Sequence, residues 1–106
     1  MSSTPGTAQA PADLSLALNP QEEGAQDAFT AKMRDELLYV GAKRLEDGTY
    51  VGVQRLVFTL AICVGVTEFS AYQRRYCYED AAECLAQYAA IRNSGDIPSG
   101  YVATRP

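Results

Sequence analysis

The sequence contains no histidine, and this absence excludes several classes of active site. Without histidine there is no Ser-His or Cys-His nucleophile pair and no histidine ligand for a metal ion. A general base would have to be a carboxylate, a tyrosine or a lysine, and the only lysines are Lys32 and Lys43. We therefore expect a protein that is not an enzyme and that uses no cofactor.

Cysteine is scarce as well, with three residues at Cys63, Cys77 and Cys84. No two of them form a C-x-x-C pair, so we expect no metal site. The odd number and the apolar neighbours are typical of buried, reduced thiols and favour a cytoplasmic location, where thiols stay reduced. Two alternatives stay open, namely a disulfide between Cys77 and Cys84 and a reactive thiol at Cys77, near Arg75 and a helix start.

Basic side chains are outnumbered, nine against 13 acidic ones, and the formal net charge is −4. Because phosphate binding needs a basic surface, this balance disfavours nucleic acid as a partner. The most apolar run, residues 56–66, is too short to span a bilayer and predicts a buried strand instead. The first residues also lack the charged and apolar regions of a secretory signal, so we expect no membrane association.

Large apolar side chains are rare between residues 1 and 18. This composition predicts a disordered tail, followed by one α+β domain over residues 19–106. The alternative is a partner-binding peptide in which Leu14, Leu16 and Leu18 form a short strand.

One helix is predicted before the strands begin. Asn19 and Pro20 are typical of a helix start, and apolar residues at every fourth position predict an amphipathic helix over about residues 20–36. Two apolar runs, 38–45 and 50–58, then flank an Asp-Gly pair, which predicts a hairpin.

The second of these runs continues to residue 67, which is long for one strand. The pattern leaves open whether it breaks near Arg55 or Phe58, or does not break. Gly65 within the run predicts a bulge or a close backbone approach.

Residues 72–92 contain the clearest secondary-structure signals in the sequence. Alternation over 72–78 predicts a strand, and a change to a period of 3.6 at Glu79 predicts a helix that ends near Arg92. Residues 101–104 are typical of a short edge strand or a packed tail. The whole pattern predicts an α+β fold, with a small antiparallel sheet of three to four strands and two helices packed on one face.

The strand over 72–78 also holds the candidate binding residues, which are Tyr72, Arg74, Arg75, Tyr76 and Tyr78. Tyrosine and arginine are the residues that most often dominate interface energy, so we expect a protein partner. Alternation places the three tyrosines on one face, and if that face is the core, Arg75 lies on the exposed one. The alternative is nucleic-acid binding, in which aromatic rings stack on bases and arginines hold phosphates.

Residues 56–101 resemble a family of small uncharacterised proteins from bacteria and their tailed phages. The shared pattern is an apolar run with Phe-Thr, a glycine, an acid, an RYCY strand, an alanine-rich helix and a G-D-x-P-x-G-aromatic ending. These features stand here at Phe58-Thr59, Gly65, Glu68, 75–78, 81–85 and 95–101. Two positions that are usually tryptophan in that family are tyrosine or a small residue here, and its lysine-rich ending is missing.

The resemblance implies a phage or prophage setting and no catalytic residue. In that setting we expect an accessory or inhibitory protein that acts by contact. One specific hypothesis is that it blocks access of substrate to a host defence enzyme, as anti-CRISPR proteins do.

Overall fold

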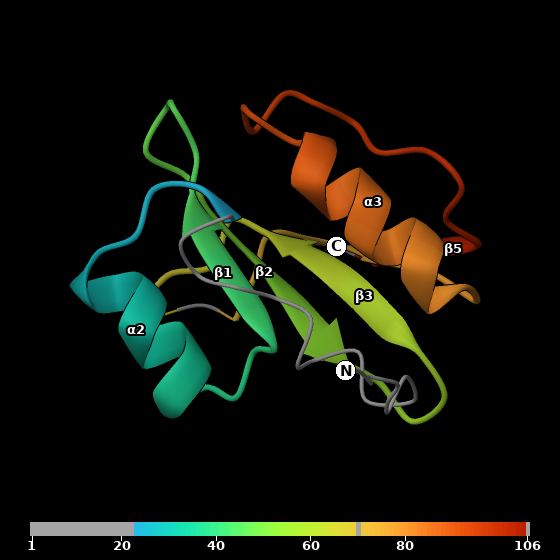
Figure 1. The fold of residues 1–106 in the computed structure, drawn as a ribbon, viewed down its shortest axis with the longest axis horizontal. Helices are drawn as coiled ribbons and strands as arrows, with labels where there is room; N and C mark the ends of the chain where they lie inside the picture. Colours follow the sequence, from blue (N-terminus) through green and yellow to red (C-terminus); the bar gives the residue numbers. More distant parts are fainter. Residues whose placement is uncertain (1–22, 70, 106) are drawn as a thin grey trace, which may run out of the picture.

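The computed structural model describes residues 23–69 and 71–105, which form two helices and a five-stranded antiparallel sheet (Figure 1). This confirms the predicted α+β class. The elements are, in chain order, α2 (Ala28–Asp35), β1 (Gly41–Arg44), β2 (Tyr50–Arg55), β3 (Leu60–Val64), β4 (Arg74–Cys77), α3 (Ala81–Ala90) and β5 (Ala103–Arg105). The predicted tail and the predicted helix start at Asn19 lie outside the described residues.

The strands lie in the sheet in their chain order, and each is antiparallel to its neighbours. The sheet has five strands where three to four were predicted. One reason is that the long apolar run divides into β2 and β3, joined by a turn in which the Leu56 N–H donates to the Thr59 carbonyl at 2.7 Å. The other is that the segment after α3 returns as β5 beside β4.

The predicted hairpin between β1 and β2 is confirmed. Gly48 has a φ of 90° at its turn, and the Leu45 N–H donates to the Thr49 carbonyl at 2.7 Å. The bulge at Gly65 is confirmed as well, because the N–H groups of Gly65 and Val66 both donate to the Tyr50 carbonyl, at 3.0 and 3.1 Å. Two residues that oppose one residue are the pattern of a β-bulge.

The two helices cover opposite faces of the sheet, which corrects the prediction that both pack on one face. Side chains alternate along a strand, so Ile62 and Cys63 of β3 point to opposite sides. Ile62 packs with residues of α3, and Cys63 packs with Met33 of α2. The prediction overlooked what β3 indicates, because every residue of this strand is buried, and a strand without a polar face is typical of a sheet that is covered on both sides.

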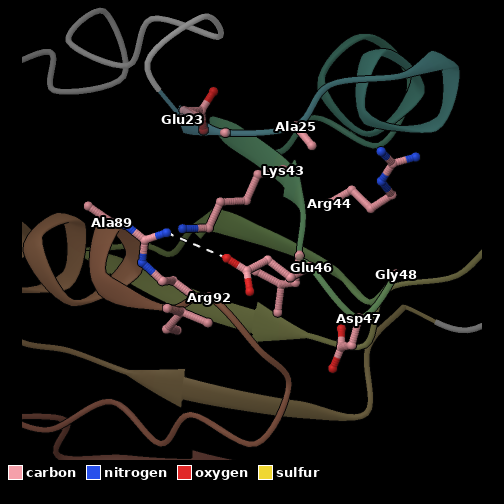
Figure 2. A pocket seen from close by; sticks show the side chains of 12 residues that line it. Glu23, Ala25, Lys43, Arg44, Glu46, Asp47, Gly48, Ala89 and Arg92 are labelled. Carbon is pink, nitrogen blue, oxygen red and sulfur yellow. Dashed lines mark ion pairs between the residues drawn. The ribbon is translucent and has the colours of Figure 1, made fainter.

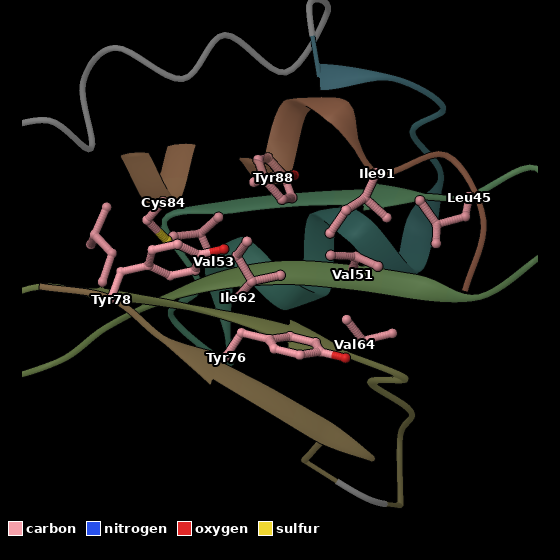
Figure 3. Close-up of a cluster of buried hydrophobic side chains, with 11 residues drawn as sticks. Leu45, Val51, Val53, Ile62, Val64, Tyr76, Tyr78, Cys84, Tyr88 and Ile91 are labelled. Carbon is pink, nitrogen blue, oxygen red and sulfur yellow. The ribbon is translucent and has the colours of Figure 1, made fainter. Parts of the chain in front are cut away.

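We call the two clusters of buried side chains the α3-side core and the α2-side core. Figure 3 shows the α3-side core between α3 and the strands. It consists of Leu45, Val51, Val53, Leu60, Ile62, Val64, Tyr76, Tyr78, Cys84, Tyr88 and Ile91. The smaller α2-side core consists of Met33, Tyr39, Ala42, Cys63 and Val66.

The helix α2 begins at Ala28, so the prediction of one helix over residues 20–36 is wrong. Gly24 has a φ of 139°, and Ala25 forms a β-bridge with Arg44 instead of continuing a helix. The side chain of Asp27 then caps α2, because it accepts a hydrogen bond from the Thr30 N–H at 3.0 Å.

The predicted second helix is confirmed as α3. Asp80 is its N-terminal cap and accepts from the N–H of Ala82 at 2.9 Å. The helix ends at Ala90, and the following Ile91 is extended but remains buried. Neither α2 nor α3 is long and apolar enough to cross a membrane.

Candidate functional site

The five predicted binding residues do not form one surface. Tyr76 and Tyr78 are buried in the α3-side core, with 7% and 1% of their surface exposed. The Tyr78 hydroxyl donates to the Ser99 carbonyl at 2.8 Å, and burial raises the pKa of Tyr78 to about 12. Both tyrosines are therefore structural residues of the core. In that case, the alternation of side chains along the strand places Arg75 on the opposite face of the sheet.

Tyr72 does not share their face. It precedes β4, so the alternation within that strand does not govern it, and its ring packs against the α2-side core. The Arg75 guanidinium lies over this ring, 5.3 Å from its centroid. The Arg75 Nη1 also donates to Gln54 Oε1 at 3.0 Å. Arg75 is thus held between an aromatic ring and an amide.

The register of β5 brings a further arginine to this position. Arg105 is exposed and lies directly opposite Arg75, so both side chains leave the sheet on its α2 side. We call the surface formed by Gln54, Tyr72, Arg75 and Arg105 the arginine face. Arg74 is exposed and points to the other side of β4. Neither Arg74 nor Arg105 forms an ion pair with any of the residues that the structure describes.

Charge is distributed unevenly between the sheet and the rest of the chain. The five strands contain six of the nine basic residues and no aspartate or glutamate. The basic residues are Lys43, Arg44, Arg55, Arg74, Arg75 and Arg105. An acidic protein therefore presents a basic sheet.

The comparisons with known proteins add no family. No family model, no curated protein and no solved structure matches this chain.

A second candidate is a hollow of about 730 Å³ between residues 23–25, the turn after β1 and the C-terminal end of α3 (Figure 2). Lys43 forms part of its wall and is 4% exposed. The Lys43 Nζ donates to the Tyr88 carbonyl at 2.6 Å and lies 4.6 Å from the Tyr88 ring centroid. Burial lowers the pKa of Lys43.

A buried carboxylate lies on the same wall. Glu23 forms an ion pair with Arg34, and its Oε2 accepts from the Tyr88 hydroxyl at 2.5 Å and from the Ala42 N–H at 2.9 Å. Burial first, and Glu23 second, raise the pKa of Tyr88. These contacts join the segment before α2, strand β1 and helix α3. Because the Glu23 carboxylate already has three partners, we interpret this cluster as a stabilising contact between these segments and not as a reactive site.

The three cysteines are free. Cys63 and Cys84 are buried, and burial raises the pKa of each to about 12. Cys77 is half-buried, so the prediction of buried thiols holds for two residues of the three. A Cys77–Cys84 disulfide is absent because the two residues lie on opposite sides of the sheet. Within 23–69 and 71–105, no group of three histidine, cysteine or acidic residues is placed to hold a metal ion.

Exposed apolar side chains gather at one end of the sheet, a feature that the sequence pattern did not reveal. Val57 and Phe58 form the tip of the β2–β3 turn and are 87% and 96% exposed. Leu38 precedes β1 and Val102 precedes β5, so both lie at that same end and are also exposed.

Proposed function

We propose that this chain is a small, non-catalytic protein-binding module whose contact surface is β4 together with β5. The observation that carries the proposal is the set of arginines on these strands. Arg74 and Arg105 are exposed and form no ion pair with described residues, while Arg75 is held in place by Tyr72 and Gln54. Arginine beside tyrosine is the composition of interface hot spots.

A protein partner fits this surface better than nucleic acid. Base stacking needs exposed rings, but Tyr76 and Tyr78 are in the core and Arg75 covers the ring of Tyr72. Exposed aliphatic residues such as Val57 favour contact with protein, because they offer neither a ring for a base nor a charge for a phosphate. The basic strands are the one feature that supports nucleic acid as the alternative, against a net charge of −4.

The resemblance to small phage and bacterial proteins supports a more specific form of the proposal. A phage-derived module of this size can act as an accessory or inhibitory protein by occupying a surface of a host protein. The anti-CRISPR-like hypothesis is one example of such an inhibitor.

Quantitative affinity purification with a tagged protein tests the proposal. Parent protein, an Arg74→Glu/Arg105→Glu variant and an Arg92→Glu control are each incubated with bacterial lysate, once with and once without nuclease treatment. Arg92 is a suitable control because it is also an exposed arginine, located beyond α3 and outside the proposed surface. We expect specific proteins to be retained by the parent and the control and lost by the double variant.

Two results would contradict the proposal. If every retained protein also binds the double variant, β4 and β5 are not the contact surface. If nuclease treatment removes all binding, the partner is nucleic acid.

A further inference from the structure

The pairing of Arg75 with Arg105 is unfavourable in the isolated protein. The two residues are direct cross-strand partners in β4 and β5. Like charges at such positions repel each other, because the Cβ atoms of opposed residues are only about 5 Å apart. None of the five strands offers an acidic residue to compensate for this repulsion.

The neighbours of Arg75 position its guanidinium without neutralising it. Gln54 accepts one hydrogen bond and the Tyr72 ring lies beneath, but neither carries a negative charge. The Arg75 Nε is buried and makes no hydrogen bond with any residue that the structure describes. A buried donor without an acceptor costs about 1–3 kcal/mol. The guanidinium of Arg75 therefore has no negatively charged partner among the described residues.

We propose that the arginine face binds a carboxylate of an acidic protein segment, placed between Arg75 and Arg105. A carboxylate has two oxygens and can accept from both guanidinium groups, which removes their mutual repulsion. This inference rests on the proposed protein-binding function and adds the chemistry of the partner. Charge complementarity with the two arginines favours an acidic protein segment as the ligand.

The edges of the sheet argue against the other way in which a strand can bind a peptide. The outer edge of β1 is already occupied, because Glu23 and Ala25 pair with the N–H groups of Ala42 and Arg44. The other edge strand, β5, has only three residues, and a proline follows it in the sequence. Short strands and prolines protect edges from strand addition. We therefore place the acidic segment on the face of the sheet and not along its edge.

Titration of the full chain followed by NMR tests this inference. The probes are a short glutamate-rich peptide, the same peptide with glutamine in place of glutamate, and a single-stranded oligonucleotide of equal charge. We expect the glutamate peptide to shift the Arg75 Nε–H signal and the backbone signals of β4 and β5, and the glutamine peptide to leave them unchanged. Arg105→Glu should weaken binding by about tenfold or more, whereas Arg92→Glu should change it by less than about twofold.

Three results would overturn the inference. The first is no shift at Arg75 with the glutamate peptide, and the second is equal affinity of the parent and Arg105→Glu. The third is tighter binding of the oligonucleotide than of the peptide, which would identify phosphate as the ligand. If one of these results appears while the Arg74→Glu/Arg105→Glu variant still loses proteins from the lysate, the protein-binding function stands and the acidic partner is wrong.

Discussion

The tyrosines around β4 show that one residue type can serve two purposes within a few positions. Tyr78 fills the α3-side core and its hydroxyl donates to the Ser99 carbonyl, whereas Tyr72 supports the guanidinium of Arg75. Tyr101 is partly exposed and contributes only its ring, which packs against Tyr76 with the centroids 5.0 Å apart.

Removal of the hydroxyl group tests whether Tyr78 contributes a buried hydrogen bond that Tyr101 lacks. Tyr78→Phe keeps the buried ring and loses one hydrogen bond, so we expect the free energy of unfolding to fall by about 1 kcal/mol. Tyr78→Ala should lower it by about 3–5 kcal/mol, because it empties part of the core. Tyr101→Phe is the matched control and should change it by less than about 0.5 kcal/mol. Urea denaturation measures all three, and equal effects of the two phenylalanine variants would refute this assignment.

The sequence predicted the residues of the candidate site better than their arrangement. Arg74, Arg75 and the tyrosines were found from composition, because tyrosine and arginine stand out in a short strand. The position of Tyr72 could not be predicted, since its side depends on where β4 begins. Arg105 was missed because its place opposite Arg75 depends on the register of two strands separated by a whole helix.

At the scale of elements, the β1–β2 hairpin and the second helix were predictable because their signals are local. Asp47-Gly48 specifies a turn by backbone conformation, and α3 has both an N-terminal cap and an apolar stripe. The first helix was predicted as one continuous element because an apolar residue at every fourth position is only a local preference. Gly24 and the pairing of Ala25 with β1 override it, and that pairing is a tertiary contact.

Gly52 of β2 tests the contact between the sheet and α2. A Cβ atom at this position would lie 2.7 Å from Tyr39 Cδ1 and 2.9 Å from Met33 Cε. Gly52→Ala should therefore lower the free energy of unfolding by about 1–3 kcal/mol through overpacking. Gly95→Ala, where no atom lies within 4 Å, is the control and should lower it by less than about 0.5 kcal/mol. Thermal melts that coincide for the parent and Gly52→Ala would mean that α2 does not cover this face.

Asp47 joins the β1–β2 turn to the loop after α3, and this link should respond to acid. Its carboxylate accepts from the Ser94 hydroxyl at 2.6 Å, from the Ser94 N–H at 3.0 Å and from the Thr49 N–H at 3.0 Å. These hydrogen bonds, chiefly the one from the Ser94 side chain, lower the pKa of Asp47 below its ordinary value of 3.8.

Because the folded pKa is the lower one, the contribution of Asp47 to stability is present above pH 3.8 and is lost as the pH falls below that value. We expect the melting temperature of the parent to drop over this range. Asp47→Asn should be less stable than the parent at neutral pH, and the difference should narrow in acid. A difference that is constant between neutral pH and about pH 2 would show that the charge of Asp47 is not involved.

At the scale of the whole molecule, the sheet is covered on both sides and its charge is separated from that of the rest of the chain. Two covered faces explain why β3 is buried throughout and why a single-faced arrangement was the wrong prediction. The concentration of basic residues in the strands could not be predicted from the sequence, because it becomes clear only when the bounds of the strands are known. At the β4–β5 side of the sheet, two exposed arginines, Arg74 and Arg105, form no ion pair with described residues of this negatively charged protein.

A surface adapted for binding an acidic partner should be a source of instability in the free protein. Arg105→Glu replaces the repulsion with Arg75 by an attraction between cross-strand partners. We expect the free energy of unfolding to rise by about 0.2–1 kcal/mol at low salt, in the same variant that loses acidic ligands. Arg92→Glu, which instead breaks the exposed ion pair with Glu46, should lower it or leave it unchanged. Melts in low and high salt measure the effect, and the gain should shrink as salt screens the charges. If Arg105→Glu is instead less stable than the parent, Arg105 is a structural residue. A variant that gains stability and loses binding is expected only when the charge of Arg105 serves to bind a partner.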